Sequence, residues 1–168
     1  MKVAVTGGSG RIGVTTVRVL RQAGHDVLSL DLVPSPDLNL PHRVMDLSDK
    51  DAVMRVFEGF DAICHLGEMP HVIGGDWQKA YAHNVQVGSL VMESAAKLGV
   101  KKLIYTSTCQ VYGCFGSQYG RYVPPARLPF DETMTPQPHS SYALSKYPNE
   151  IYARQLVERA EITIAAFR

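Results

Sequence analysis

The sequence predicts an α/β fold: a doubly wound parallel sheet of about six strands, with helices on both faces. Short apolar segments of strand length alternate with longer segments of helical period along the 168 residues. The apolar segments are nearly unbroken by polar residues, which is typical of strands buried on both faces of a sheet. Strands and helices that alternate in this way form parallel βαβ units with right-handed crossovers.

Local signals place the individual elements. We expect strands at residues 3–6, 27–31, 43–45, 62–66, 103–107 and 162–167. We expect helices at residues 14–23, 51–57, 77–98 and 142–160. Gly24 and Gly99 end two of these helices, as glycine commonly does. Residues 113–140 contain Gly and Pro without clear periodicity, and because long loops in compact domains are usually functional, we expect an active-site loop there.

The composition indicates one globular domain. Hydrophobic residues make up 45% of the chain and charged residues 20%, as in ordinary soluble proteins. The formal net charge of +1 predicts neither a nucleic-acid nor a membrane partner. No apolar run reaches the roughly 20 residues of a membrane helix, and the N-terminus lacks a signal-peptide pattern. We expect a cytoplasmic protein that binds no metal and keeps Cys64, Cys109 and Cys114 as reduced thiols that are buried or half-buried.

A glycine-rich turn follows the first expected strand. The octet TGGSGRIG, residues 6–13, precedes a helix and spaces Gly7, Gly10 and Gly13 three apart. The first glycine permits a tight turn, the second lets a pyrophosphate approach the backbone, and the third lets helix and strand pack closely. The helix N-terminus offers N–H groups and a partial positive charge to phosphates. This pattern predicts a dinucleotide site in a Rossmann fold.

An acidic residue stands where such folds bind the adenosine ribose. Asp31 ends the second expected strand, and a carboxylate there accepts hydrogen bonds from a ribose diol and repels a 2′-phosphate. This favours NAD over NADP, although Arg11 in the glycine turn weakens the preference; a solvated turn aspartate is the alternative for Asp31. Asp46 is suited to hold the adenine amino group, and alternatively Asp46 or Ser48 caps the next helix.

A tyrosine and a lysine four residues apart open the last expected helix. Tyr142 and Lys146 in YALSK share one helix face, so both can address one ligand. A tyrosine pKa of about 10 is too high for a base at neutral pH, but a neighbouring ammonium and a positive nicotinamide would lower it. Thr106, Ser107 and Thr108 follow the fifth strand at the ligand-binding edge of the sheet. One of these hydroxyls can bind the substrate oxygen, while capping and turn formation account for others.

These motifs occur in the order of a known family. TGGSGRIG, HLGE at residues 65–68, NVQVGS at 84–89, YTSTCQVYG at 105–113 and YALSK resemble the extended short-chain dehydrogenase/reductase family, NAD-dependent epimerase/dehydratase type. The likeness covers nearly the whole chain, as the N-terminal cofactor-binding portion of such an enzyme. The resemblance implies that Tyr142 is the general base, that Lys146 holds the nicotinamide ribose and tunes Tyr142, and that Thr108 binds the substrate.

The resemblance also implies the cofactor contacts. The pyrophosphate would lie on the glycine turn, the adenosine ribose on Asp31 and the adenine on Asp46, and Asn84 would brace the site. The expected cofactor-binding residues are Gly7, Gly10, Arg11, Ile12, Gly13, Asp31, Asp46, Leu47, Leu66, Gly67, Asn84, Thr106, Tyr142 and Lys146. The expected cofactor is NAD, with NADP as the less favoured alternative.

Three features depart from the family pattern. Gly67-Glu68 stands where family members often carry two small residues, and the carboxylate would either repel the diphosphate or contact substrate. Pro148 lies well inside the catalytic helix, where its ring should kink the helix and remove a hydrogen bond. The chain ends at Arg168, whereas family enzymes are longer. We therefore expect residues 1–168 to be one NAD(P)-binding domain, truncated from a longer enzyme and lacking the usual C-terminal substrate domain.

The predicted function is an NAD-dependent reaction at a carbinol carbon of a sugar or sugar nucleotide. The enzyme would remove hydride from that carbon, with Tyr142 as the base. Return of the hydride by an epimerase, elimination by a dehydratase and net oxidation by a sugar dehydrogenase all remain open. Cys109-Gln110 after Thr108 argues against dehydration, because family dehydratases often carry an acid there. The alternative is a dinucleotide-binding module with no catalysis in this form.

The last expected strand predicts self-association. Ile162, Ile164 and Phe167 would lie beside an unpaired backbone edge. An apolar edge strand invites pairing with another chain, so we expect a homo-oligomer.

Overall fold

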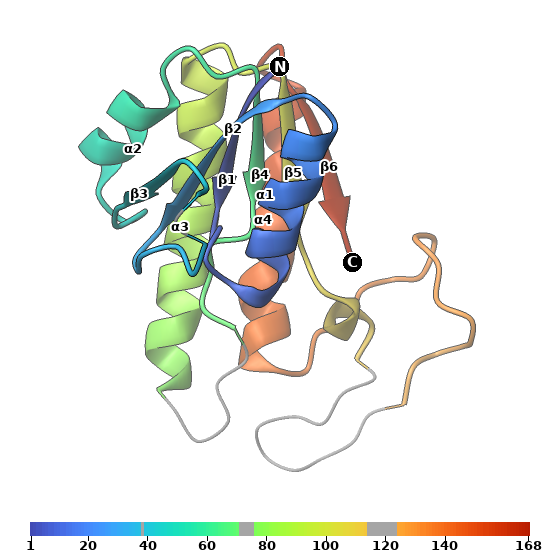
Figure 1. Ribbon diagram of the computed structural model, residues 1–168. Helices are drawn as coiled ribbons and strands as arrows, with labels where there is room; N and C mark the ends of the chain where they lie inside the picture. The colour runs from blue at the N-terminus through green and yellow to red at the C-terminus, as the bar shows by residue number, and fades with distance from the viewer. Residues whose placement is uncertain (38, 71–75, 114–123) are drawn as a thin grey trace.

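A six-stranded, all-parallel sheet forms the centre of the molecule (Figure 1). The computed structural model describes residues 1–37, 39–70, 76–113 and 124–168. The strands lie in the order β3-β2-β1-β4-β5-β6. They are β1 (Lys2–Thr6), β2 (Asp26–Asp31), β3 (His42–Val44), β4 (Ala62–His65), β5 (Lys102–Thr106) and β6 (Thr163–Phe167). This sheet confirms the predicted fold class.

Helices connect the strands and cover both faces of the sheet. They are α1 (Arg11–Gln22), α2 (Lys50–Phe57), α3 (Trp77–Lys97) and α4 (Ser141–Val157), with a 3-10 helix, η1, at Cys109–Tyr112. α1 lies on one face, where Val17 packs against Val5 and Val27 of the sheet. α3 and α4 lie side by side on the other face, and α2 packs beside α3 (Figure 1). All ten expected elements are present with ends within three residues of those expected, whereas η1 was not expected.

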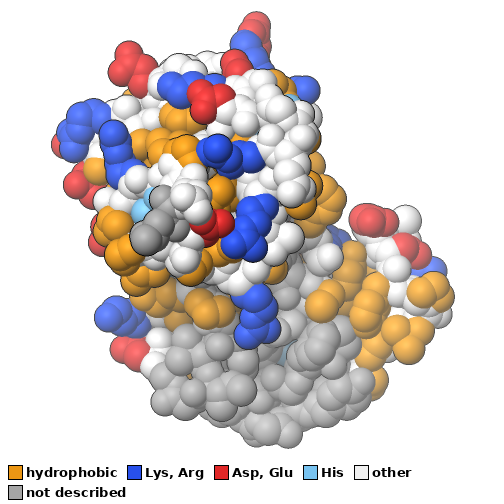
Figure 2. Space-filling model, viewed as in Figure 1, with side chains coloured by type: hydrophobic (Ala, Val, Ile, Leu, Met, Phe, Trp, Pro, Cys, Tyr) orange, Lys and Arg blue, Asp and Glu red, His pale blue; other side chains and the backbone are white. Residues whose placement is uncertain are grey.

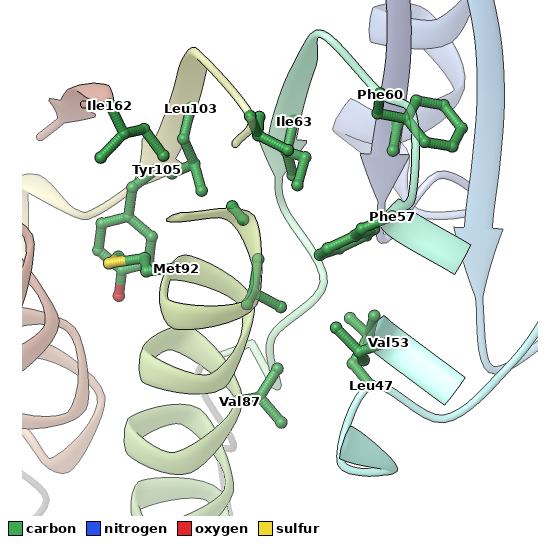
Figure 3. Close-up of a cluster of buried hydrophobic side chains, with 14 of the residues drawn as sticks. Leu47, Val53, Phe57, Phe60, Ile63, Val87, Met92, Leu103, Tyr105 and Ile162 are labelled. Atoms are coloured by element: carbon green, nitrogen blue, oxygen red, sulfur yellow. The ribbon is translucent and has the colours of Figure 1, made fainter. Parts of the chain in front are cut away.

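The main core lies between the sheet and α2, α3 and α4 (Figure 3). Ile63 on β4 and Leu103 and Tyr105 on β5 point into it, because alternate side chains of a strand face the same side. Phe57 and Met92 fill it from the helices. Full burial of one large apolar side chain contributes about 1.5–3 kcal/mol, so this core fixes the sheet against the helices that carry the site.

β6 ends the sheet on the side away from β3. It pairs with β5 in parallel, and among the described residues no strand pairs with its other side. Phe167 is 59% exposed there, but Ile162 is buried in the main core and Ile164 packs partly against it. The expected exposure is therefore right for Phe167 and wrong for Ile162, which precedes the strand and turns inward.

The surface carries both signs of charge on the face viewed in Figure 1. In the space-filling view, Lys and Arg side chains share this face with Asp and Glu side chains, and hydrophobic side chains lie between them (Figure 2). No helix in the described ranges is both long and apolar enough to cross a membrane.

The long connection after β5 is described only in part. Its first residues form η1, and residues 124–140 run without helix or strand to the start of α4. Gln137 donates its N–H to the carbonyl of Val111 at 2.6 Å, which ties the two ends of the connection together. Cys64 on β4 is buried as expected, whereas Cys109 at the start of η1 is exposed, so the expectation of a buried or half-buried thiol is wrong for Cys109. Residues 114–123, including Cys114, lie outside the described residues.

Candidate active site

A cavity of about 590 Å³ lies at the carboxyl ends of the strands. Parallel α/β sheets bind ligands at this edge, because the connecting loops leave a crevice there. The residues that line it are Gly7, Gly10, Arg11, Ile12, Gly13, Asp31, Leu32, Met45, Asp46, Leu47, Leu66, Gly67, Glu68, Met69, Pro70, His83, Thr106, Tyr142 and Lys146. They include every expected cofactor-binding residue except Asn84.

The glycine turn has the shape that a phosphate site needs. Gly7 has φ +69°, a conformation that favours glycine, and its carbonyl accepts the N–H of Gly10 at 3.1 Å. A Cβ at Gly7 would lie 2.7 Å from the backbone of Gly67, and one at Gly13 would collide with the Gly7 carbonyl. α1 begins at Arg11, and its first N–H groups have no partner within the helix, so this end of α1 fits a phosphate group.

Asp31 is held by backbone amides at the edge of the cavity. Its Oδ2 accepts the N–H of Ser9 at 2.9 Å and its Oδ1 accepts the N–H of Val33 at 3.3 Å. These bonds fix the carboxylate at the end of β2, and a carboxylate has about four acceptor positions, so capacity remains for ribose hydroxyls. Asp31 is half-buried and organises the glycine turn, which distinguishes it from a solvated turn aspartate.

Asp46 also lines the cavity, and it does not cap α2. The N-cap is Asp49, whose side chain accepts the N–H of Ala52 at 3.0 Å. Asp46 instead accepts the N–H of Ser48 at 2.8 Å, and this bond lowers the pKa of the Asp46 carboxyl. The helix-cap alternatives for Asp46 and Ser48 are therefore wrong, because α2 begins at Lys50, one residue after Asp49.

Tyr142 and Lys146 lie on successive turns of α4, and both line the cavity. The helix begins just before Tyr142 because the side chain of Ser140 accepts an N–H of the first turn. Lys146 Nζ lies 5.5 Å from the centroid of the Tyr142 ring and donates to the carbonyl of Thr106 at 2.8 Å. α4 continues through Pro148, so the proline does not end the helix.

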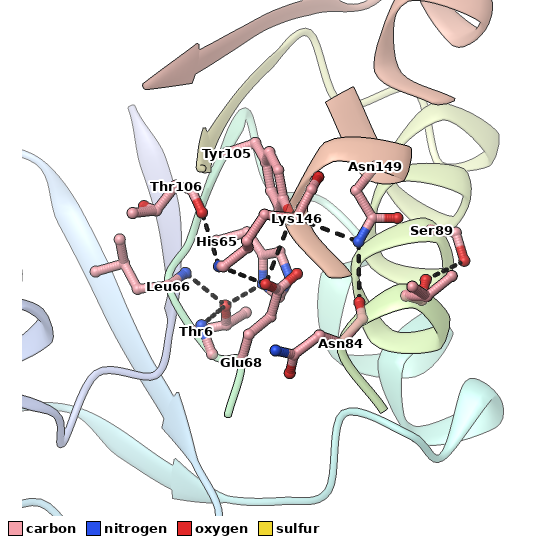
Figure 4. Close-up of polar contacts among 12 residues, drawn as sticks. Thr6, His65, Leu66, Glu68, Asn84, Ser89, Tyr105, Thr106, Lys146 and Asn149 are labelled. Carbon is pink, nitrogen blue, oxygen red and sulfur yellow. Dashed lines mark hydrogen bonds and ion pairs between the residues drawn. The ribbon is translucent and has the colours of Figure 1, made fainter. Parts of the chain in front are cut away.

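Glu68 occupies the floor of this site (Figure 4). Its Oε2 forms an ion pair with Lys146 Nζ, and the two side chains are 2% and 4% exposed. Its Oε1 lies 3.4 Å from Nε2 of His65. The sequence identifies Glu68 as unusual, but the expected roles of repelling a diphosphate or contacting substrate leave out this partner within the protein.

The pKa of Tyr142 lies above its usual value. Burial raises it most, and the Glu68 carboxylate and Cys109 raise it further. The expectation joined Lys146 to a positive nicotinamide as the two cations that lower this pKa. In the protein itself the shift is upward, because burial is the largest cause and Glu68 offsets the charge of the ammonium.

Asn84 acts on the segment after β4 and not on the cavity itself. It is fully buried in α3, accepts the N–H of Met69 at 2.8 Å and donates to the carbonyl of Met69 at 2.9 Å. It also donates to Ser145 Oγ at 3.2 Å. Asn84 therefore braces the loop against α4, as expected, but it is not among the cavity-lining residues as a cofactor ligand would be.

The three hydroxyl residues after β5 have separate surroundings. Ser107 donates to the buried carboxylate of Glu150. The side chain of Thr108 accepts the N–H of Gln110 at 3.2 Å and caps η1. Thr106 lines the cavity. The Thr108 hydroxyl thus caps η1, as the capping alternative predicts, and the Ser107 hydroxyl is buried against Glu150.

Several lining residues carry no sequence signal. Leu32 and Met45 follow β2 and β3, Met69 and Pro70 belong to the segment after β4, and His83 comes from α3. In the part of the chain that the structure describes, no cluster of three or more His, Cys, Asp and Glu side chains could hold a metal ion.

The fold and this site together define a dinucleotide-binding protein with a Tyr–Lys pair beside the cofactor cavity. The NAD dependent epimerase/dehydratase family model matches residues 3–168, and the chain belongs to this family. Two similar proteins have different activities. The UDP-glucose 4-epimerase of Neisseria meningitidis serogroup C is 31% identical over 163 residues, which cover 86% of this chain and 45% of that protein. The L-arabinose 1-dehydrogenase (NAD(P)(+)) of Haloferax volcanii is 27% identical over 172 residues, which cover 99% of this chain and 65% of that protein.

A similar solved structure contains the cofactor. The short-chain dehydrogenase/reductase superfamily protein from Agrobacterium tumefaciens with bound NAD is 28% identical, with a TM-score of 0.86. The match covers 100% of this chain and 48% of that one. The chain thus spans about half to two thirds of the length of these relatives. Membership of the predicted family is confirmed, and with it NAD as the family's cofactor.

Proposed function

We propose that this chain binds NAD in the cavity and takes part in hydride transfer at a carbinol carbon of a sugar or sugar nucleotide. One observation carries the proposal: the glycine turn, Asp31, Tyr142 and Lys146 line a single cavity of about 590 Å³. A phosphate site, a ribose-binding acid and an acid–base pair are the parts that such a reaction needs. The epimerase and the dehydrogenase among the similar proteins support this class of reaction.

Each part has a role that follows from its surroundings. The N-terminus of α1 binds the pyrophosphate and Asp31 binds the adenosine ribose. Lys146 donates one N–H to the Thr106 carbonyl and one to the Glu68 carboxylate, so its third N–H can donate to a nicotinamide ribose. NAD, when bound, supplies the hydride acceptor. Tyr142 takes the proton of the carbinol hydroxyl. The family resemblance gives Thr108 a hydrogen bond to the same oxygen, although Thr108 caps η1 and is not among the residues that line the cavity.

The second candidate function is dinucleotide binding without catalysis. The raised pKa of Tyr142 favours it, because a phenol that holds its proton is a poor base at neutral pH. The first function remains the better supported one, because a binding module has no need of Tyr142 and Lys146 on one helix face.

Calorimetric titration tests the cofactor site. We expect NAD to bind more tightly than NADP, because Asp31 repels a 2′-phosphate. Asp31→Ala should narrow or reverse this preference, and Asp37→Ala is the control, since Asp37 pairs with Arg18 and does not line the cavity. Equal or tighter binding of NADP by the unaltered chain would contradict the assignment of Asp31.

Stopped-flow measurement of NADH formation from sugar substrates separates the two functions. Tyr142→Phe should lower hydride transfer about 10²–10⁴-fold while NAD affinity stays nearly unchanged, because the phenol oxygen serves the substrate. If Tyr142→Phe keeps more than about a tenth of the hydride transfer, Tyr142 is not the base. If the unaltered protein binds NAD and oxidises none of the sugars tested, the binding module is the better description.

A further inference from the structure

A buried chain of polar side chains runs beneath the cavity from β1 to α4 (Figure 4). It links Thr6 at the end of β1, His65 at the end of β4, Glu68 just beyond β4 and Lys146 on α4. Thr6 directly precedes the glycine turn, and Lys146 directly serves the acid–base site. The two halves of the cavity are therefore connected through side chains that are almost fully buried.

The hydrogen bonds of Thr6 orient the His65 ring. Thr6 Oγ1 accepts the N–H groups of Leu66 and Gly67, both at 3.2 Å, so its hydroxyl proton is available to His65 Nδ1 at 2.6 Å. In the neutral ring the other nitrogen, Nε2, then carries the hydrogen. Nε2 faces Glu68 Oε1 at 3.4 Å, which directs an N–H toward the carboxylate.

The surrounding helix leaves space for the carboxylate. A Cβ at Gly88 of α3 would lie 2.8 Å from Glu68 Oε1 and would collide with the side-chain amide of Asn149. Tyr105 donates toward Glu68 Oε2 at 3.5 Å. Glu68 Oε1 and His65 Nε2 are buried, and within the described residues neither has a partner closer than their 3.4 Å separation. The carboxylate thus has a prepared position whose hydrogen bonds are incompletely made.

The charge balance of the site depends on Glu68. A buried carboxylate is costly unless a cation is paired with it, and Lys146 is that cation. The titratable groups around the pair are His65 from β4, Tyr105 from β5 and Tyr142 from α4, and Cys109 of η1 also acts on Tyr142. The charge that would stabilise a Tyr142 phenolate is therefore shared with a carboxylate.

We propose that Glu68 is a positioning residue, whose carboxylate anchors Lys146 and offsets its charge, and thereby sets the pH range in which Tyr142 can lose its proton. The anchoring follows from the contacts of this chain, and only the consequence for catalysis rests on the proposed function. With Glu68 ionised the phenol keeps its proton to higher pH, and with Glu68 neutralised the full charge of Lys146 favours the phenolate.

The test uses NMR titration of the chain labelled with ¹³C at the tyrosine Cζ. Tyr142→Phe and Tyr152→Phe identify the two resonances. Glu68→Gln keeps the shape of the side chain and removes its charge, so we expect Tyr142 to begin to ionise at least about one pH unit lower. Glu93→Gln is the matched control, because Glu93 also pairs with a lysine, Lys97, and also accepts from a tyrosine, Tyr152.

The control has its own expected result. Burial, and after it the Glu93 carboxylate, raise the pKa of Tyr152 to about 12, so Glu93→Gln should lower the pKa of Tyr152 and leave Tyr142 unchanged. Glu68→Gln should do the reverse. If Tyr142 ionises at the same pH in the unaltered chain and in Glu68→Gln, the proposal is wrong. Should Glu68→Gln not fold, Glu68→Ala removes the same charge and gives the same test.

A second readout connects the proposal to catalysis. In assays of the sugar reaction, the acid limb of the pH profile of kcat/KM should move to lower pH in Glu68→Gln and stay in place in Glu93→Gln. A loss of rate at every pH without movement of the limb would reduce Glu68 to a structural role. The two proposals fail separately: absent NAD binding contradicts the proposed function, whereas the tyrosine titration needs no cofactor.

Discussion

Two buried ion pairs lie one turn apart on α4, and they are built differently. In the first, Lys146 pairs with Glu68, whose other oxygen is 3.4 Å from His65. In the second, Glu150 accepts from Arg168 through Nε at 3.0 Å and Nη2 at 2.6 Å. Ser107 donates to the Glu150 carboxylate as well, and Arg168 Nη1 donates to the hydroxyl of Tyr112 at 2.9 Å.

The difference indicates that the two ion pairs of α4 have different roles. The Glu150–Arg168 pair is bidentate and hydrogen-bonded on both sides, which is the geometry that holds two segments together. It joins α4 to the end of β6. The Glu68–Lys146 pair has fewer hydrogen bonds and lines the cavity, so its charges remain able to act on a ligand. A satisfied buried pair serves stability, and an incompletely satisfied one beside a cavity serves chemistry.

The largest effect is expected when a substitution removes the Glu68–Lys146 pair. Lys146→Ala should lower hydride transfer about 10²–10⁴-fold and also weaken NAD binding, because the ammonium would serve both Tyr142 and the ribose. Arg168→Ala should leave NAD affinity nearly unchanged, because Arg168 does not line the cavity. Stopped-flow kinetics and calorimetry on both variants measure this. Equal losses of NAD affinity would abolish the distinction between the two pairs.

The next largest effect is expected when a substitution removes the Glu150–Arg168 pair. Arg168→Ala leaves the 5%-exposed Glu150 carboxylate without its cation, and it should lower the free energy of unfolding by about 3–5 kcal/mol. Urea denaturation followed by circular dichroism measures the change. Arg159→Ala is the control, because Arg159 is exposed just after α4, and its expected change is below about 0.5 kcal/mol. A loss from Arg168→Ala as small as that of the control would show that this pair is not structural.

A smaller effect distinguishes the pairs by pH. Burial alone would raise the pKa of Glu68, but His65 and Lys146 outweigh it and hold the pKa below its usual value. A lowered folded-state pKa gives stability that is present above the unfolded value of about 4.3 and is lost as the pH falls through the folded value. Glu68→Gln should therefore be less stable than the unaltered chain at pH 7, and the difference should narrow below about pH 4. A difference that stays constant to pH 3 would contradict this.

The smallest effect concerns the strand that the second pair anchors. Phe167 is 59% exposed on β6, whose outer edge has no strand partner among the described residues. We expect concentration-dependent self-association of the 168-residue chain, and Phe167→Ser should weaken it, because less apolar surface is buried on pairing. Sedimentation velocity over a range of concentrations measures this. If the unaltered chain and Phe167→Ser are both monomers at every concentration, the outer edge of β6 is not an interface.

Local patterns predict the elements of this fold well because their causes are local. The apolar periods of α1 and β4 come from which residues face the interior, and glycines mark the ends of helices. The misses have a different origin. Asp46, Ser48 and Asp49 can all cap a helix, and the packing of α2 selects Asp49. In the same way, packing and not the local pattern turns Ile162 into the core.

The sequence by itself determined the cofactor edge of the site. Gly7, Asp31 and Tyr142 follow strands or open helices, and the topology of a parallel sheet brings such positions to one edge whatever the details of packing. Only the tertiary structure decided the partner of Lys146. Glu68 lies far from it in the chain and reaches it through the space left by Gly88, and no local period encodes a distance between two elements. That contact pairs two buried charges, because an ionised group that is removed from water needs a nearby group of opposite sign.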